Sequence, residues 1–433
     1  MARYITLPEV DEAMKPARRV FLIGGAHSGF LGKFHPDFIW KGHPDFGKRD
    51  NPTIEEHLKK AIVDALDNTG IPAAAVQKGY VGNFTGELFV KQGHMGAMAA
   101  GAHPDLDFKP FTRVEGACAS GGLALVAGID AVSAGNDVVL VSGAEVQTTV
   151  NAMEGADYLA RASHYETQRS IDPFTFPCMF ARHAKSYREA YNVSEEDLAK
   201  VVVKAYANAN RNPHAHMHAF KMSLDNASVA SKSNPAFLAN EEYKDYMKVS
   251  DCSQVSDGAS AVVLVSEAAM QKHNINPKNA VEIVSYGHAT SPLSELANPL
   301  ELTTTKHAAD EAYADAGVSA KDMGVAEVHD CFSVTELLMY EALGFAEKGH
   351  GVDLAREEAT TLSGRIPVNT GGGLLAFGHP VGATGVKQAL EIFKQQKGQA
   401  GDYQIANPPE WGIAANMGGD DRTAVVTIFR NAS

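Results

Sequence analysis

The feature of this sequence that most restricts its fold is a loose internal repetition. In the first half, the apolar run that begins at Arg18 ends in glycines and predicts a buried strand. Residues 54–68 then have the apolar spacing of a helix, which Gly70 ends. In the second half, residues 280–286 and 305–317 repeat this strand and helix, and both helices run into a similar turn. The order predicts an α/β molecule built from two pseudo-duplicated halves.

The later elements extend the match between the halves. The strand at 79–84 corresponds to 325–328, and the small, apolar helix at 116–135 corresponds to a Gly-initiated helix at 382–394. Each of these helices is followed by a predicted strand, at 137–142 and 424–429. We therefore expect residues 1–145 and 251–275 to form an N-terminal half, and 276–433 a C-terminal half.

Residues 146–250 lie between the two halves and are polar, with many His, Met and Asn residues. We interpret them as a loop or insertion region. Long connections in compact enzymes often cover an active site. The alternative is a surface insertion that takes no part in binding.

Composition and charge restrict the class of protein. The 433 residues are 45% hydrophobic and 21% charged, as in globular enzymes, and the net charge of -14 argues against nucleic acid or an anionic membrane surface as a partner. Residues 1–20 lack the pattern of a signal peptide, and no run of about 18 apolar residues predicts a membrane span. A cytoplasmic location is therefore expected.

The cysteines are widely separated, which indicates reduced thiols and neither a disulfide framework nor a metal site. They are Cys118, Cys178, Cys252 and Cys331. Cys118 is the candidate nucleophile, because it lies among small residues at 116–122, where a helix begins. The amides and partial positive charge of a helix N-terminus favour a thiolate. The alternative is a structural cysteine packed among alanines.

His379 lies between Gly378 and Pro380, just before the helix that corresponds to the one after Cys118. If the halves pack about a pseudo-twofold axis, both helix N-termini face one centre, and the thiol meets the imidazole as a Cys–His pair. A structural histidine in a turn and a glycine-rich phosphate loop are the alternatives.

Four motifs together resemble the thiolase superfamily. They are Gly-Ala-Cys-Ala-Ser-Gly-Gly at 116–122, Val-Ser-Gly-Ala-Glu-Val at 141–146, Ser-Asp-Gly-Ala at 256–259, and Asn-Thr-Gly-Gly-Gly-Leu-Leu-Ala-Phe-Gly-His-Pro-Val-Gly-Ala-Thr-Gly at 369–385. The resemblance implies a five-layered α-β-α-β-α thiolase fold, a homodimer or homotetramer, and coenzyme A (CoA) thioesters as substrates with no tightly bound cofactor.

His329-Asp330-Cys331-Phe332 is similar to the sterol carrier protein type of thiolase. Thiolases usually carry a second catalytic cysteine before the last strand, but residues 412–419 contain none, and we expect Ala415 in its place. By resemblance, Cys331 is then the acid/base. Some relatives of this type work beside a small zinc-ribbon OB-fold protein, which makes such a partner possible here.

The resemblance implies acylation of Cys118 with help from His379, followed by Claisen condensation or its reverse, thiolysis. His329 and His379 are the expected side-chain donors to the thioester oxygen, and the amides of Cys118 and Gly418 are the expected backbone donors. The other histidines considered for CoA phosphates are better explained as a solvated face. They are His183, His214, His216 and His218.

Three alternative functions remain open from the sequence. A ketosynthase-like condensing enzyme shares the duplicated fold, but Cys331 and the long glycine-rich motif favour a thiolase. The aldolase branch of the superfamily works without an acyl-cysteine, and the presence of Cys118 argues against it. A non-catalytic lipid carrier or scaffold is the third alternative, because the second cysteine is missing from residues 412–419.

Overall fold

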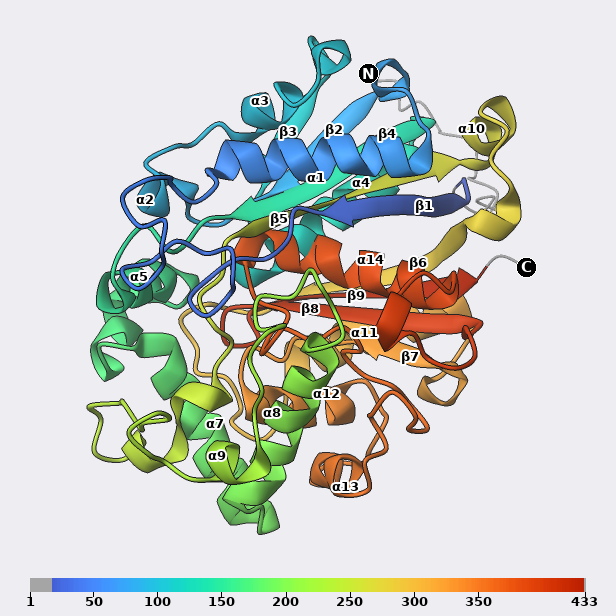
Figure 1. Ribbon diagram of the computed structural model, residues 1–433. Helices are drawn as coiled ribbons and strands as arrows, with labels where there is room; N and C mark the ends of the chain where they lie inside the picture. The colour runs from blue at the N-terminus through green and yellow to red at the C-terminus, as the bar shows by residue number, and fades with distance from the viewer. Residues whose placement is uncertain (1–17, 432–433) are drawn as a thin grey trace, which may run out of the picture.

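The computed structural model describes residues 18–431, which form one nine-stranded mixed sheet (Figure 1). The segment for which the sequence predicts no signal peptide lies almost entirely outside the described residues. The strands are, in spatial order, β3 (Phe111–Val114), β2 (Lys78–Gly82), β4 (Val138–Glu145), β5 (Gly258–Ser266), β1 (Val20–His27), β6 (Val281–Thr290), β9 (Thr423–Asn431), β8 (Trp411–Gly418) and β7 (Val325–Glu327).

The two halves of the sheet share one topology, which confirms the predicted duplication. In the N-terminal half, β1 pairs antiparallel with β5, β5 pairs antiparallel with β4, and β4 pairs parallel with β2. In the C-terminal half, β6, β9, β8 and β7 repeat these relations in the same order. The halves join where β1 pairs with β6 through residues 20–22 and 281–283.

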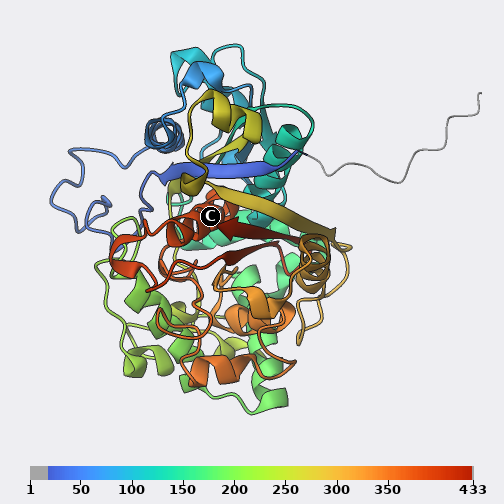
Figure 2. The ribbon, with the colours of Figure 1, turned by 90° about the vertical axis from the view of Figure 1, so that its right-hand side faces the viewer.

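Helices complete the predicted α-β-α-β-α layers (Figures 1 and 2). On the outer faces, α1 (Ile54–Thr69) packs on β1 and β5, and α11 (Thr303–Ala316) packs on β6 and β9. Between the half-sheets, α4 (Ser120–Ser133) packs on β2 and β4, while α14 (Thr384–Gln396) packs on β7 and β8. The two central helices also pack on each other.

The residues of α1 explain its bounds. Thr53 and Glu56 form a capping box that satisfies free amides at the helix start. Leu58 and Ile62 are fully buried on the face toward the sheet, and Gly70 ends the helix with a left-handed φ of 67°.

The segment at 146–250 contains several helices and is not one continuous loop, while its interpretation as a loop or insertion region stays a prediction. Its helices are α5 (Ala152–Leu159), α6 (Tyr165–Gln168), α7 (Thr175–Tyr191), α8 (Glu195–Ala209) and α9 (Leu224–Ser228). Phe180 of α7 and Val202 of α8 share a core with Leu337 of α12 (Ser333–Ala342), and α8 also contacts α13 (Gly351–Arg356). The polar residues occupy the outer faces of amphipathic helices, which bury their apolar faces.

Three short helices complete the described α-helices: α2 (Gly86–Phe89), α3 (Met95–Ala100) and α10 (Glu267–Lys272). None of the helices within residues 18–431 has the length and hydropathy needed to cross a membrane. The domain boundaries at 145, 250 and 275 stay a prediction.

Glycines bring the first turns of α4 and α14 into backbone contact. A Cβ atom on Gly385 would lie 2.1 Å from the amide nitrogen of Gly122 and 2.4 Å from Oδ1 of Asn416. A Cβ atom on Gly121 would lie 2.7 Å from the amide nitrogen of Gly385. These separations leave no room for a methyl group, so the central layer depends on glycine at these positions.

We predict that Gly385→Ala destabilises the protein by about 1–3 kcal/mol, because the added methyl group meets backbone that cannot move aside. The urea midpoint of unfolding measures this change. Gly155→Ala in α5 is the matched control, because the nearest atoms to its new Cβ lie at ordinary contact distances of 3.6 and 3.7 Å. A Gly385→Ala midpoint equal to that of Gly155→Ala would contradict the proposed tight contact.

Candidate active site

Cys118 lies in a tight turn that leads into α4. Ala117 has a left-handed φ of 53°, which is unusual for a residue with a side chain and is found at functional sites. The Ser120 hydroxyl stabilises the turn, since it accepts from the Gly116 amide at 3.0 Å and donates to the Ala117 carbonyl at 2.6 Å. The Cys118 side chain is half-buried, whereas Cys178 and Cys331 are buried.

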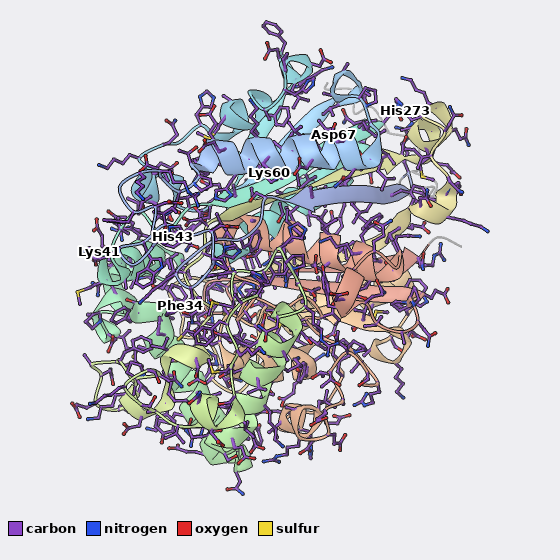
Figure 3. The ribbon with its side chains drawn as sticks, viewed as in Figure 1. Phe34, Lys41, His43, Lys60, Asp67 and His273 are labelled. Carbon is purple, nitrogen blue, oxygen red and sulfur yellow. The ribbon has the colours of Figure 1, made fainter. Side chains whose placement is uncertain are left out.

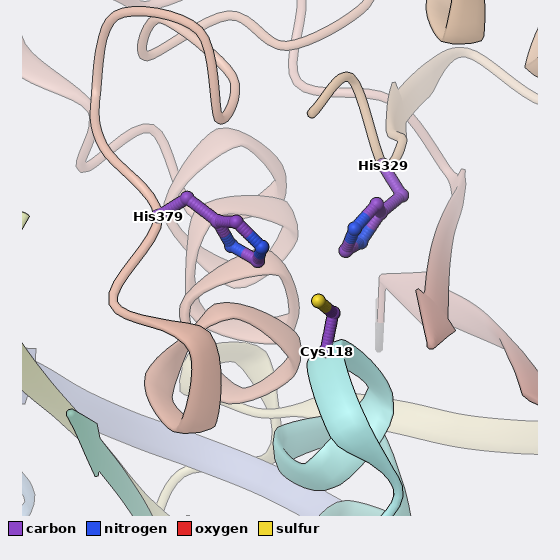
Figure 4. A group of neighbouring side chains, drawn as sticks. All are labelled: Cys118, His329 and His379. Atoms are coloured by element: carbon purple, nitrogen blue, oxygen red, sulfur yellow. The ribbon is translucent and has the colours of Figure 1, made fainter. Parts of the chain in front are cut away.

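His379 projects from the loop before α14 toward Cys118 (Figure 4). Its Nδ1 lies 2.6 Å from the hydroxyl oxygen of Thr384, and that hydroxyl lies 3.1 Å from the carbonyl of Pro380. With the Thr384 hydroxyl donating to Pro380, its oxygen accepts the Nδ1 hydrogen of His379. The buried Nε2 has no partner and therefore presents a lone pair.

His329 projects into the same space from the segment after β7. Its Nδ1 faces two donors, the Met417 amide at 3.3 Å and the Asn416 side-chain nitrogen at 3.2 Å. An imidazole nitrogen that faces two N–H donors is an acceptor, so the hydrogen is on Nε2. The two imidazole rings lie edge to face, with centroids 5.1 Å apart.

The reactive atoms of Cys118, His329 and His379 all lie within 4.8 Å of one another. The structure thus brings together Cys118, the expected nucleophile, with His379, its expected partner, and His329, an expected donor to the thioester oxygen. Their histidines are in opposite tautomers, one ready to accept a proton and the other ready to donate a hydrogen bond.

Burial keeps this group neutral in the resting protein. It raises the pKa of the Cys118 thiol to about 12 and lowers the pKa of His379 to about 3. The pKa of His329 lies well below its ordinary value, because of burial and of the neighbouring His379 and Lys387. In the free protein, desolvation thus opposes the thiolate that the helix N-terminus favours, and the activation of Cys118 stays a prediction.

Two backbone amides adjoin the sulfur. The N–H groups of Cys118 and Gly419 interact with the thiol and lower its pKa, although by less than burial raises it. Gly418, the expected backbone donor, instead ends β8 beside the carbonyl of Gly116, which a Cβ on Gly418 would approach to 2.3 Å. The part of Gly418 as a backbone donor stays a prediction.

Asn416, and not Ala415, is the residue of β8 that reaches the site. Ala415 is buried on the opposite face of the strand, in a core with Ile413 and Met417. Side chains alternate along a strand, so Asn416 faces the central helices, and its Nδ2 donates to the carbonyl of Cys118 at 3.0 Å. The expectation for Ala415 is therefore wrong.

Cys331 is buried next to this group but outside it. Its sulfur lies 4.0 Å from the Thr335 hydroxyl. Burial and the neighbouring Cys118 hold the pKa of Cys331 well above its ordinary value. Its expected part as acid/base stays a prediction.

Glu145 is a buried residue near the site whose part the sequence did not reveal. Its carboxylate accepts from the amides of Phe84 at 2.9 Å and Gly382 at 3.2 Å, and from the Asn83 side chain at 3.0 Å. It thereby ties the loop after β2 to the start of α14. Burial raises its pKa to about 7. The sequence feature that could have pointed to Glu145 is its position in the Val-Ser-Gly-Ala-Glu-Val motif.

The remaining candidate histidines divide into buried and accessible ones. His183 is buried and bonds Asp420 at 2.6 Å. His216 bonds Ser256 at 2.9 Å and the carbonyl of Lys33. The residue after Lys33, Phe34, is exposed and is labelled in Figure 3. The expectation of a solvated face is wrong for His183 and His216. His214 is exposed and His218 is partly exposed.

The spacing of Cys118, His329 and His379 would also suit a metal ion, and they are the sole such group among residues 18–431. Metal ligation requires a lone pair on each imidazole nitrogen that points inward. Because Nδ1 of His329 accepts from Met417 and Asn416, the inward Nε2 carries hydrogen. The donor set therefore does not fit a three-ligand metal centre.

Comparisons with known proteins agree with this arrangement. Residues 44–268 match the family described as "Thiolase, N-terminal domain", and residues 285–431 match "Thiolase C-terminal domain-like". An acetyl-CoA acetyltransferase of Methanothermobacter thermautotrophicus is 36% identical over 87% of this chain and 94% of its own length. Bovine sterol carrier protein 2 is 32% identical over 82% of this chain and 64% of its own length.

Solved structures show the same fold. The structure described as "Ltp2-ChsH2(DUF35) aldolase" has a TM-score of 0.74 at 19% identity and covers 95% of this chain and 98% of that one. Human mitochondrial 3-ketoacyl-CoA thiolase in complex with CoA has a TM-score of 0.68 at 16% identity, with 96% and 99% covered. The two matched regions span both halves of the chain, and they contain Cys118 and His379, whose side chains meet at the site. The chain therefore belongs to the thiolase family.

Proposed function

We propose that this thiolase-family protein transfers acyl groups from CoA thioesters through an acyl-cysteine on Cys118. The observation that carries the proposal is the pair of opposite histidine tautomers at one sulfur. A nucleophile needs a base with a free lone pair, and a thioester oxygen that becomes negative needs a fixed donor. His379 and His329 supply one each.

In the first half-reaction, the Cys118 sulfur attacks the thioester carbonyl while its proton moves to Nε2 of His379. The carbonyl oxygen becomes negative beside the backbone N–H groups of Cys118 and Gly419, which adjoin the sulfur. The carbon–sulfur bond to CoA then breaks. The departing CoA thiolate takes a proton from Cys331, and the acyl group stays on Cys118.

In the second half-reaction, the Cys331 thiolate removes a proton from the α-carbon of a second CoA thioester. The enolate oxygen accepts a hydrogen bond from Nε2 of His329, and the enolate carbon attacks the acyl group on Cys118. Cys118 leaves as a thiolate and regains its proton from His379, while Cys331 has already taken the α-proton. Thiolysis follows the same steps in reverse.

The finer assignment follows the relatives. The similarity to an acetyl-CoA acetyltransferase favours acetyl-CoA or another short acyl-CoA as the first substrate. A homodimer or homotetramer, a cytoplasmic location and a zinc-ribbon OB-fold partner stay part of the proposal. One solved relative is described in complex with CoA, which supports a CoA thioester as the substrate. Another is described with a DUF35 protein, which supports the search for a partner protein.

The first prediction from this proposal is a covalent acyl group on Cys118 after mixing with acetyl-CoA. Mass spectrometry of the intact protein should show one acetyl adduct, and peptide mapping should place it on Cys118. Cys118→Ala should remove the adduct, whereas Cys252→Ala, which changes the other half-buried cysteine, should keep it. An adduct that survives in Cys118→Ala would reject the proposed nucleophile, and no adduct with any acyl-CoA would favour the carrier alternative.

The second prediction concerns pH. Because the pKa of Cys118 is about 12 and that of His379 is about 3, the resting pair is a neutral thiol and a neutral imidazole at pH 7. The thiolate fraction then rises with pH below the thiol pKa. Alkylation of Cys118 by iodoacetamide without substrate should accelerate about tenfold per pH unit from about pH 7 to 9. A rate that is already level at pH 7 would instead indicate a preformed ion pair.

The third prediction separates the half-reactions. Cys331→Ala should still acylate Cys118, because solvent water can protonate the departing CoA thiolate in place of Cys331. It should lose condensation and the exchange of α-protons with deuterated water, because it lacks the proposed acid/base. Cys178→Ala, which also removes a buried thiol, is the control and should keep both. Condensation by Cys331→Ala at a near-native rate would show that another group moves the α-proton.

A further inference from the structure

The side chain of Asn416 is held in one orientation. It is buried, and its Oδ1 accepts a hydrogen bond from the Gly122 amide at 2.9 Å. An amide oxygen can only accept, and an amide nitrogen can only donate. The contact with Gly122 therefore determines that Nδ2 is the atom that faces the active site.

Nδ2 of Asn416 has two hydrogen bonds to give, and both positions are filled. It donates to the carbonyl of Cys118 at 3.0 Å and points at Nδ1 of His329 at 3.2 Å. The Met417 amide reaches the same Nδ1 at 3.3 Å. One residue of β8 thus contacts the segment of the nucleophile and the imidazole opposite it.

We propose that Asn416 is a positioning residue that fixes His329 as the tautomer with hydrogen on Nε2. The inference rests on the proposed function, because it assigns His329 as the hydrogen-bond donor to the enolate oxygen of the second thioester. A carboxylate at this position would instead accept from Nδ1 and would turn the Nε2 lone pair toward the substrate. Asn416 thereby decides whether His329 donates to the substrate or accepts from it.

The Met417 amide also donates to Nδ1 of His329 and favours the same tautomer, so Asn416 is the side chain that makes this choice. The titratable or charged groups near His329 are Cys118, His379 and Lys387, and Cys331 lies next to Cys118. Lys387 is paired with Glu327 at 2.8 Å, and Nδ1 of His379 is occupied by Thr384. Space for the Asn416 amide exists because Gly122 and Gly385 lack side chains, since Cβ atoms there would lie 2.8 and 2.4 Å from Oδ1.

The test is the tautomer of His329, read by nitrogen-15 NMR of histidine-labelled protein. The signal of His329 is assigned by its loss in His329→Gln. In the wild-type protein we expect hydrogen on Nε2, and in Asn416→Asp we expect it on Nδ1. Gln388→Glu is the matched control, because Gln388 is also a buried amide bonded to β8, at the carbonyl of Ala415, and it should leave His329 unchanged.

Hydrogen on Nδ1 in the wild-type protein overturns the inference without any variant, so the test survives if Asn416→Asp does not fold. An unchanged tautomer in folded Asn416→Asp also overturns it. Kinetics give a second readout, since condensation should fall about 100-fold in Asn416→Asp through loss of one oxyanion donor, and more than acylation falls. Failure of wild-type Cys118 to accept an acetyl group would reject the proposed function and leave the tautomer result standing.

Discussion

The contact between the first turns of α4 and α14 is the constraint on which the rest of the structure depends. Gly121 and Gly122 meet Gly385 without intervening side chains, so the two helix starts approach as closely as backbones allow. Cys118 and His379 lie just before these turns and are carried to one centre. The same glycines leave the space that the amide of Asn416 fills. Catalytic geometry in this protein is therefore a consequence of how two helices pack.

The close packing also determines the electrostatics of the site. Water is largely excluded, and desolvation is the largest influence on the pKa of Cys118, His329 and His379. Neutral groups are the stable state of such a site, and charge forms there only when substrate and fixed donors can share it. The hydrogen bonds at Nδ1 of each imidazole then determine which histidine can accept a proton at Nε2 and which can donate a hydrogen bond from it.

Much of this arrangement could be predicted from the sequence because it repeats. The predicted helix at 54–68 agrees with α1, and the equivalent positions of Cys118 and His379 in the two halves predicted their meeting. The sequence could not predict which side chains of β8 face the site, because this depends on the register in which β8 pairs with β9. For that reason Asn416 was missed and Ala415 was chosen. The helices at 146–250 were missed because their apolar stripe is visible only against the neighbouring core.

The hydrogen bond from Asn416 to the carbonyl of Cys118 joins positions that are 298 residues apart in the sequence. Contacts of such separation form late in folding, after the local elements and usually after the halves have collapsed. Until β8 is in place, Cys118 is an ordinary thiol, without the Gly419 amide beside it and without a fixed His329 opposite. An ordinary thiol has a pKa below the value of about 12 in the folded protein, so folding lowers the thiolate fraction of Cys118 and makes its reaction depend on the proton acceptor that the assembled site provides.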